Sequence, residues 1–394
     1  MSIARMVGFV LVFGGLVVAT HIYLYRRLFR DPQWSRRARL IGLGFLVTMA
    51  VAMVSGLVIN RFVARFLTEA TGYVIYGWMG VVALTVPPLL FIDVLRALDA
   101  LRRRRRHPAP LDAQRRLALS RGAAVLTGLG AAAAAAKGVD TALDPPELRE
   151  VEVPIAHLPA ALDGLRIAQL SDVHIGPTLG RDFMAAVVAR VNDLKPDLVA
   201  ITGDLVDGSV QRLTDHTAPL ADLRSRHGTF FCTGNHEYYS GVEPWLAELA
   251  RLGIKVLRNE RVRLVHDGAP LDVLGVDDWT SKGFGNGHGH DPDRACAGRD
   301  PTVTSVMLAH QPKAVEDAAR LGMDLVLSGH THGGQMWPAQ WIVRLVQPYV
   351  RGLHRHRERT WIYVHTGTGY WGPPMRLGVR AEIALLTLRT APTA

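Results

Sequence analysis

Near its C-terminus the chain reads Asp324-Leu-Val-Leu-Ser-Gly-His330-Thr-His332-Gly-Gly-Gln335. A short apolar run leads directly into two histidines that are separated by one residue and surrounded by glycines. Side chains alternate between the two faces of an extended segment, and glycine permits a tight backbone path. The two histidines can therefore serve two different metal ions if the backbone curls around the pair. Taken alone, this G-H-x-H pattern is equally compatible with a surface loop whose histidines share no role.

Four further polar clusters follow apolar runs that the sequence predicts to be strands. In α/β sheets ligands bind beyond the carboxyl ends of the strands, so these clusters are expected to converge. A single D-x-H or a lone histidine is usually structural, but five clusters at predicted strand ends indicate one site. The predicted strands and the residues after them are Leu165–Leu170 with Asp172 and His174, Asp197–Ile201 with Asp204 and Asp207, Gly228–Cys232 with Asn235, His236 and Glu237, and Val303–Leu308 with His310.

In this order, D-x-H, G-D-x-x-D, G-N-H-E, H and G-H-x-H resemble the motifs of the calcineurin-like metallophosphoesterase superfamily. The resemblance covers about Leu165 to Leu388, with every core motif intact. Gly275-Val-Asp-Asp278 and Gly367–Arg376 also resemble the membrane-associated bacterial branch, whose Gly-Leu-Tyr appears here as Gly-Leu-His354. The resemblance implies an α/β fold, a two-sheet sandwich flanked by helices.

The resemblance also implies a site for two divalent or transition-metal ions. Asp, His and Asn offer oxygen and nitrogen ligands without a thiolate, a set that suits Mn, Fe or Zn. Two ions in such a site clamp a phosphate, generate hydroxide near neutral pH and stabilise an in-line displacement. The implied ligands of one ion are Asp172, His174 and His332, those of the other are Asn235, His310 and His330, and Asp204 bridges the two.

One histidine beside these ligands is the candidate catalytic residue. His236 follows the ligand Asn235 and is not assigned to a metal. We expect it to protonate the leaving oxygen or to stabilise the phosphoryl charge. Asp207 or Glu237 can orient a ligand or His236 from outside the metal shell. A helix cap or a surface ion pair is the competing interpretation for both carboxylates.

A second G-H-x-H pattern, Gly287-His288-Gly-His290, lies in a glycine-rich stretch with no apolar strand before it. We interpret it as a mobile loop without a metal role. The two cysteines, Cys232 and Cys296, form no C-x-x-C motif, and Cys232 ends an apolar strand. Their placement indicates neither a disulfide framework nor a thiol enzyme.

The first part of the chain carries long apolar segments. Ile3–Tyr25, Leu40–Ile59 and Tyr73–Leu95 are each long enough to cross a bilayer and lack a polar face. Leu117–Ala136 is a weaker fourth candidate, because it is rich in alanine and glycine and contains Arg121. The predicted organisation is an all-α transmembrane domain of three to four spans over residues 1–137, a linker over 138–153 and a catalytic domain over 154–394.

The distribution of arginine predicts the orientation of these segments. The linkers after the first and third segments are rich in arginine, whereas the linker after the second holds only Arg61 and Arg65 with Glu69. The positive-inside rule makes the rich linkers cytoplasmic, and a fourth crossing then places the catalytic domain outside. Arg115-Arg116 before an alanine-rich stretch also resembles a twin-arginine export signal. Both cues predict a multi-pass inner-membrane protein with a periplasmic catalytic domain.

The net charge of +10 is concentrated in the apolar part of the chain. The first 150 residues hold 20 Lys and Arg against 9 Asp and Glu, so the remainder carries a charge of about −1. The basic linkers are therefore expected to face membrane lipids, whose cytoplasmic headgroups are anionic. No basic patch marks the catalytic region, and no nucleic-acid partner is expected.

Two classes of function remain open from the sequence. The first is a membrane-anchored hydrolase of phosphodiesters, phosphomonoesters or pyrophosphates, for which anchoring suggests a phospholipid or a lipid-linked diphosphate as substrate. The second is a membrane sensor or scaffold whose phosphoesterase domain acts as a binding module. The intact ligand set and the Asn235-His236 pair favour the enzyme, since a binding module would be expected to have lost one of them.

Overall fold

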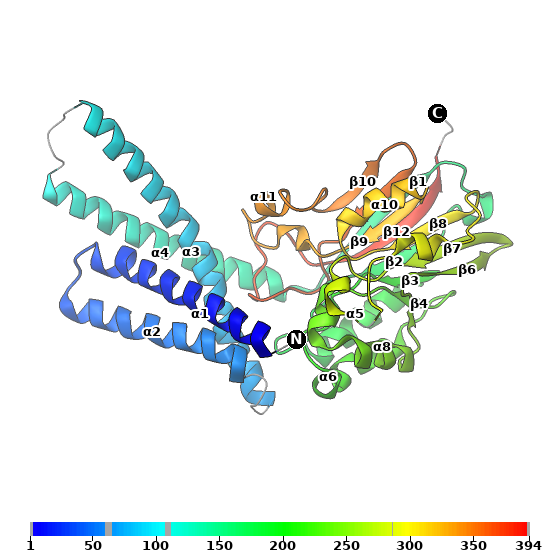
Figure 1. The fold of residues 1–394 in the computed structure, drawn as a ribbon, viewed down its shortest axis with the longest axis horizontal. Coiled ribbons are helices and arrows are strands. Elements are labelled where there is room, and N and C mark those ends of the chain that lie inside the picture. The colour runs from blue at the N-terminus through cyan, green and yellow to red at the C-terminus, as the bar shows by residue number, and fades with distance from the viewer. Residues whose placement is uncertain (1–2, 60–64, 107–111, 286, 392–394) are drawn as a thin grey trace. The chain divides into compact units, whose positions relative to one another are not determined.

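The computed structural model describes residues 3–59, 65–106, 112–285 and 287–391. The chain forms two compact units, Met1–Asp140 with Gly372–Met375, and Thr141–Trp371 with Arg376–Ala394. We refer to the first as the helical unit and to the second as the sandwich unit. Figure 1 shows the elements of both units, coloured along the chain.

Long helices make up the described part of the helical unit. By length and composition, the stretches Arg36–Gly56, Thr71–Arg102 and Ala113–Leu143 are apolar enough to cross a membrane. The third of the long helices runs on through Pro87 and Pro88 without ending there. The expected all-α domain ahead of the catalytic fold is thereby confirmed. The helices are α1 (Ile3–Tyr25), α2 (Arg36–Ile59), α3 (Arg65–Arg106) and α4 (Ala113–Leu143), with a π-helical turn η1 (Arg26–Arg30) after α1.

Polar side chains connect α1 with α3 inside the helical unit. Asp93 accepts hydrogen bonds from the Tyr23 hydroxyl and from Arg27 Nε, each at 2.8 Å. Trp78 Nε1 donates to His21 Nε2 at 2.9 Å, which leaves the proton of His21 on Nδ1. A polar group without a hydrogen-bond partner costs roughly several kcal/mol of free energy in hydrocarbon, because no water is present to replace the partner. These pairs therefore fix the two helices against each other.

Arg121 lies in α4, the helix whose segment is the weakest predicted span. Its Nε donates to the carbonyl oxygen of Pro32 at 3.0 Å, and its guanidinium lies 5.3 Å from the centre of the Trp34 ring. Protein groups thus satisfy this charge, which reduces the cost of an arginine in an apolar helix.

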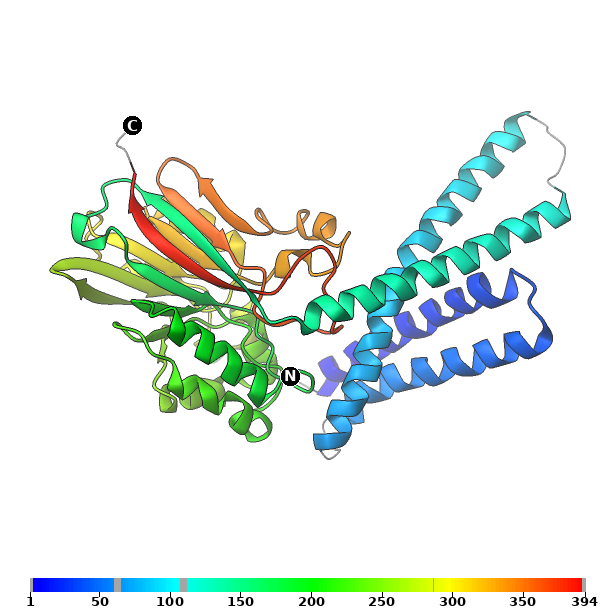
Figure 2. The ribbon, with the colours of Figure 1, turned by 180° about the vertical axis from the view of Figure 1, so that it is seen from behind.

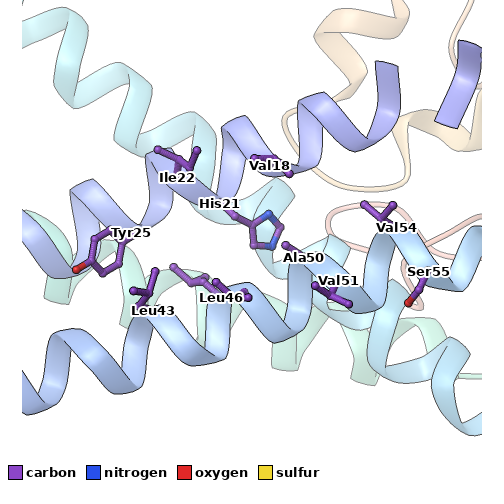
Figure 3. A pocket seen from close by; sticks show the side chains of 11 residues that line it. Val18, His21, Ile22, Tyr25, Leu43, Leu46, Ala50, Val51, Val54 and Ser55 are labelled. Atoms are coloured by element: carbon purple, nitrogen blue, oxygen red, sulfur yellow. The ribbon is translucent and has the colours of Figure 1, made fainter. Parts of the chain in front are cut away.

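A cavity of about 680 Å³ lies between α1 and α2 (Figure 3). Its walls are apolar side chains apart from His21, Tyr25 and Ser55. The complete lining is Val18, His21, Ile22, Tyr25, Leu43, Leu46, Val47, Ala50, Val51, Val54 and Ser55.

Two six-stranded sheets form the sandwich unit. In spatial order the first sheet consists of β1 (Glu147–Ile155), β12 (Glu382–Thr390), β2 (Arg166–Leu170), β3 (Leu198–Ile201), β4 (Thr229–Phe231) and β5 (Lys255–Val256). The second consists of β10 (Gly352–His356), β11 (Thr360–Val364), β9 (Leu325–Ser328), β8 (Thr304–Leu308), β7 (Ala269–Gly275) and β6 (Glu260–His266).

The strand directions bring the polar motifs to one edge of the sandwich. Strands β2, β3, β4 and β5 run parallel, as do β7, β8, β9 and β11. The antiparallel pairs β12–β2, β6–β7 and β10–β11 complete the sheets. Because the carboxyl ends of parallel strands meet at the same edge, the segments that follow β2, β3, β4, β8 and β9 gather there.

Apolar side chains fill the space between the sheets. Leu198, Val306 and Leu386 are fully buried members of this core. Helices cover the outer faces, and Trp245 is buried between the first sheet and its helices. The predicted two-sheet sandwich flanked by helices is thus confirmed. The helices over the first sheet are α5 (Arg181–Asp193), α6 (Val210–Thr217) and α8 (Val242–Arg251), and those over the second are α9 (Pro292–Cys296) and α10 (Val315–Arg320).

The segment predicted as a linker over residues 138–153 has regular structure instead. Helix α4 continues to Leu143, and β1 begins at Glu147, three residues after Asp144. Strand β1 pairs in parallel with β12 over nine residues. Figure 2 shows the two strands side by side from behind. The sandwich unit therefore begins earlier than residue 154. The physical reason is a long-range pairing with the last strand, which a local pattern of alternating charges does not reveal.

Candidate metal centre

The motif residues lie in the segments that follow the parallel strands. Asp172 and His174 follow β2, Asp204 follows β3, and Asn235 begins the short helix α7 (Asn235–Ser240) after β4. His310 follows β8, and His330 and His332 follow β9, with His332 opening the 3₁₀ turn η6 (His332–Gly334). Both sheets thus contribute to one group of polar side chains.

A first cluster consists of Asp172, His174 and His332, whose ligand atoms lie within 4.8 Å of one another. The Nε2 atoms of His174 and His332 are 3.0 Å apart, and His332 Nε2 is 3.4 Å from Asp172 Oδ1. All three side chains are buried. The residues that the family resemblance implied for one ion are therefore neighbours in space.

A second cluster consists of Asp204, His310 and His330, again within 4.8 Å. His310 Nε2 is 3.0 Å from Asp204 Oδ2 and 3.3 Å from His330 Nδ1. The same Asp204 oxygen lies 4.0 Å from His174 Nε2 in the first cluster. The Asp204 carboxylate thus stands between the two clusters.

Buried donor atoms of this group face one another or have no hydrogen-bond partner among the described residues. The buried amide oxygen Oδ1 of Asn235 has no hydrogen-bond partner. His310 directs Nδ1 to the carbonyl oxygen of Thr202 at 2.7 Å, which leaves Nε2 facing Asp204 Oδ2 at 3.0 Å. The facing Nε2 atoms of His174 and His332 are too close for two protonated rings. Imidazoles, carboxylates and an amide oxygen in this arrangement fit divalent or transition metals.

The backbone at the site adopts a conformation that is uncommon outside glycine. A positive φ in the left-handed region costs a non-glycine residue roughly 1–3 kcal/mol and persists where the surroundings enforce it. Hydrogen bonds enforce it here: the Asp172 amide donates to Gly203 O at 3.0 Å, and the His174 amide donates to Asp204 O at 3.1 Å. The motif residues with such φ values are Asp172 (51°), His174 (53°), Asp204 (50°), His330 (69°) and His332 (50°).

Two glycines of the motifs are required by close packing. A Cβ at Gly329 would lie 2.1 Å from Asp172 Oδ2, and a Cβ at Gly234 would lie 2.2 Å from Asp204 Oδ1. Real Cβ atoms do not approach oxygen so closely, so either side chain would displace a carboxylate of the site. The glycines in G-H-x-H and G-N-H-E therefore make room for the carboxylates of other motifs.

Residues 165–334 match the family model of the calcineurin-like phosphoesterases. A metallophosphoesterase of Aquifex aeolicus is 34% identical over 226 residues, which make up 57% of this chain and 85% of that protein. The chain belongs to the calcineurin-like metallophosphoesterase family. The resemblance that the sequence motifs indicated is thereby confirmed.

This chain also resembles longer proteins and solved structures. A transmembrane protein with metallophosphoesterase domain from Bos taurus is 44% identical over 292 residues, 72% of this chain and 65% of that protein. The chain thus spans just under two thirds of the length of that relative. A solved dimetal phosphatase from Danio rerio aligns with 52% of this chain and 88% of its own at 12% identity and a TM-score of 0.37.

In this metallophosphoesterase, Asp207 holds two histidines at once. Its Oδ1 lies 2.5 Å from His236 Nδ1, and its Oδ2 lies 3.1 Å from His174 Nδ1. Burial alone would raise the pKa of Asp207, but His174 and His236 outweigh it and lower that pKa. An ionised carboxylate accepts a hydrogen bond from each Nδ1–H and leaves each Nε2 directed away from it.

His236 lies at the edge of both clusters. Its amide donates to Asp204 Oδ1 at 2.8 Å, and its Nε2 is 4.0 Å from Asp204 Oδ2. Burial alone would lower the pKa of His236, but the carboxylates of Asp204 and Asp207 outweigh it and raise the pKa to about 9. The site thus favours an imidazolium at this position, as a proton donor requires.

Glu237 is a buried helix cap that supports the backbone of the site. Its carboxylate accepts from the amides of Gly234 at 2.7 Å, Leu205 at 2.8 Å and Asp204 at 3.1 Å. Burial and the nearby Asp204 carboxylate raise the pKa of Glu237 to about 7. Glu237 thus caps helix α7, as one of the two interpretations of this residue proposed. The same carboxylate oxygens also fix the turn that carries Asp204.

Arg376 is a buried residue whose contribution the motifs did not reveal. Its guanidinium donates to the carbonyl oxygens of Thr366 at 2.8 Å, of Gly367 at 3.3 Å and of Gly369. Burial lowers the pKa of Arg376 to about 10. A Cβ at Gly367 would lie 2.9 Å from His332 Nδ1, so the loop that Arg376 binds packs against this histidine. The sequence signal was the resemblance of Gly367–Arg376 to the membrane-associated branch.

The second G-H-x-H pattern lies apart from the two clusters and is packed. His288 is buried, accepts at Nδ1 from Arg258 at 2.6 Å and lies 2.8 Å from Glu243 through Nε2. His290 Nδ1 is 3.2 Å from the Asp277 carbonyl oxygen. These contacts do not fit the interpretation as a mobile loop. Arg258 and Glu243, from other segments of the chain, hold the buried His288 side chain in place. Among the described residues, no metal-ligand group includes either histidine.

We predict that Asp207→Asn weakens metal binding about 10–100-fold, the usual effect of losing a group that orients a ligand histidine. The amide oxygen can accept from one ring only, and the amide NH₂ faces the other ring. Competition between the full-length protein and a fluorescent chelator measures the affinity. Asp193→Asn, at the exposed end of α5, is the matched control and should change nothing. Unchanged affinity in Asp207→Asn would show that the contact does not position the ligand.

Proposed function

We propose that this chain is a membrane-anchored, dinuclear-metal phosphoesterase. The observation that carries the proposal is the pair of ligand clusters joined by the Asp204 carboxylate. One ion would be held by Asp172, His174 and His332 and the other by Asn235, His310 and His330, with Asp204 shared. When bound, two such ions act as Lewis acids on a phosphate and provide a nucleophile near neutral pH. The donor set favours Mn, Fe or Zn, and the family membership supports the same class of chemistry.

The protein groups around the clusters would perform the remaining steps. The carboxylates of Asp204 and Asp207 raise the pKa of His236, and its Nε2 is directed toward Asp204, away from Asp207. It would give its proton to the leaving oxygen of the ester or stabilise the developing charge there. Asp207 would keep the ring in place through Nδ1 during this transfer.

Aromatic side chains around His236 support a substrate with an apolar part. The Trp371 ring centre lies 5.8 Å and the Tyr239 ring centre 5.2 Å from that of His236, and both side chains are more than half exposed. Phe284 packs at 5.9 Å from Tyr239. Together with the apolar helices, this rim supports a phospholipid or a lipid-linked diphosphate as the phosphate ester.

The proposed location is the inner membrane, with several spans and the sandwich unit on the extracytoplasmic side. The support is the arginine content of the segments between the apolar helices, together with the apolar composition of Ala113–Leu143. Arg121 is exposed, and its contacts with Pro32 and Trp34 give the charge that α4 carries partners within the protein.

Purified full-length protein is expected to bind two transition-metal ions and, with Mn, to hydrolyse an activated aryl phosphodiester, because the ligand set is complete. Elemental analysis and release of the phenolate measure both properties. His332→Ala should lose metal, whereas His290→Ala, the same position of the other G-H-x-H, should retain it. Protein without metal or turnover would contradict the proposal. Bound metal without turnover on any phosphate ester would favour the binding module instead.

His236→Ala should leave the metal content unchanged and reduce turnover of esters with poor leaving groups about 10²–10⁴-fold, the range expected for loss of a general acid. Esters with activated leaving groups should lose less, because their leaving oxygen needs less protonation. Rates measured on a series of aryl esters test this. An equal loss across the series would indicate charge stabilisation, and loss of metal would make His236 a ligand.

A reporter fused after Ala394 tests the proposed orientation. Alkaline phosphatase is expected to be active and green fluorescent protein exported by the general secretory route is expected to be dark, since α4 would carry the sandwich unit outward. The opposite pattern would place the sandwich unit in the cytoplasm.

A further inference from the structure

The sandwich unit carries exposed large apolar side chains in the segment that follows His332 in the sequence. Within Trp337–Val346 both tryptophans are more than half exposed, and Leu345 is 83% exposed. This stretch includes the short helix α11 (Gln340–Val343). We name it the apolar ridge and define it by Trp337, Trp341, Ile342, Leu345 and Val346.

The apolar ridge is held in place by its backbone and by its flanks. The Trp337 amide donates to the carbonyl oxygen of Leu377 at 2.9 Å, and the Val343 amide donates to Ala339 O at 3.1 Å. Gln347, directly after the ridge, is buried and donates through Nε2 to Gln311 Oε1 at 3.4 Å. The exposure of these side chains therefore belongs to a folded surface. A folded apolar surface of this kind marks an interaction site.

The chemistry of the ridge fits a lipid bilayer. Two tryptophans beside aliphatic side chains are the composition of protein segments that lie at the membrane interface. From Met336 to Arg359 the sequence has five arginines and one acidic residue, Glu358. Arg344 is exposed and lies 5.1 Å from the centre of the Trp341 ring. Apolar side chains flanked by arginine complement acyl chains below anionic headgroups.

A bilayer is also the surface that this chain encounters at high local concentration. The same polypeptide contains helices that are apolar enough to cross a membrane. A weak interfacial contact becomes significant when an anchor already holds the protein at the membrane. This argument favours lipid over a protein partner for the same apolar surface.

A short chain of contacts connects the ridge with the metal centre. Gln335 lies two residues before Trp337, and its side chain exchanges two hydrogen bonds with the backbone of Trp371, at 2.9 and 3.0 Å. Trp371 in turn lies edge-on to His236. A surface that engages lipid through the ridge would thus bring the aromatic rim of the site to the headgroups.

We propose that the apolar ridge is a second membrane-binding element, by which the sandwich unit itself docks on the bilayer. Trp337, Trp341 and the aliphatic side chains enter the region between headgroups and acyl chains, and Arg344 contacts the phosphates. Docking is a property of the surface and does not require hydrolysis. A membrane-embedded phosphate ester would then meet the proposed metal centre without leaving the lipid.

Depth measurements on the full-length protein test the proposal directly. Leu345→Cys carries an environment-sensitive fluorophore, and the protein is reconstituted in nanodiscs of equimolar phosphatidylcholine and phosphatidylglycerol, with or without acyl chains bearing a nitroxide. Val265→Cys, an exposed apolar position on β6, is the matched control. Protein with only Cys232 and Cys296 gives the background labelling.

The label at position 345 is expected to shift to the blue and to be quenched by the nitroxide lipid, while the label at 265 stays in water. Equal, weak quenching at both positions would overturn the proposal. A blue shift at 345 without nitroxide quenching would also overturn it, since the ridge would then contact protein, such as a second copy of the chain. None of these results depends on turnover, so they are independent of the proposed hydrolase activity.

A charge variant adds a functional readout. The double variant Ile342→Asp/Leu345→Asp should lose nitroxide quenching of a label at position 346 (Val346→Cys) and should turn over a nitrophenyl phosphodiester in solution as before. Its turnover of a phosphodiester lipid in vesicles of the same composition should fall about tenfold or more, because burial of two large apolar side chains is lost. Val265→Asp should change neither rate. Retained quenching at 346 in the double variant would contradict the docking role of the ridge.

Discussion

The arrangement of the site depends on the contacts that compensate the buried carboxylate of Asp204. Burial alone would raise its pKa, but His310 and His236 outweigh burial and lower the pKa well below its usual range. Its Oδ1 accepts from the His236 amide, its Oδ2 faces His310, and its own amide is bound by Glu237. A buried charge is tolerated only with such compensation. The segments after β3, β4 and β8 therefore have their positions fixed by a single side chain.

Neither sheet of the sandwich holds a complete set of ligands. The first sheet carries Asp172, His174, Asp204 and Asn235 at its strand ends, and the second carries the histidines after β8 and β9. The two halves meet only because the apolar core between the sheets sets their spacing. Leu198 and Leu386 of the first sheet and Val306 and Leu325 of the second belong to that core, all fully buried. The geometry of the candidate site is thus a consequence of core packing, which tolerates little change in volume.

The parts of the fold that could be predicted from the sequence are those with a local signal. An apolar run followed by a polar turn identifies β2, β3, β4, β8 and β9 and the residues after them. Strand β1 has alternating charges and is recognisable only through its pairing with β12. The burial of His288 depends on Arg258 and Glu243, which approach from other segments. Arg376 likewise acquires its role from carbonyl groups of a loop whose path the sequence does not specify.

Two candidate ligand histidines illustrate different ways of holding an imidazole ring so that Nε2 can face a metal. His310 donates an Nδ1–H hydrogen bond to the carbonyl oxygen of Thr202 in the backbone after β3. His174 lies against the Asp207 carboxylate, which also binds His236. A carboxylate partner makes a histidine ring a stronger metal ligand than a carbonyl partner does. The negative charge of the carboxylate also stabilises the protonated form of a histidine that acts as a proton donor. Any movement of His174 is therefore transmitted to His236 through one side chain, whereas His310 is bound to the backbone after β3. The orientation of the proposed acid is thus coupled through Asp207 to the ring of His174.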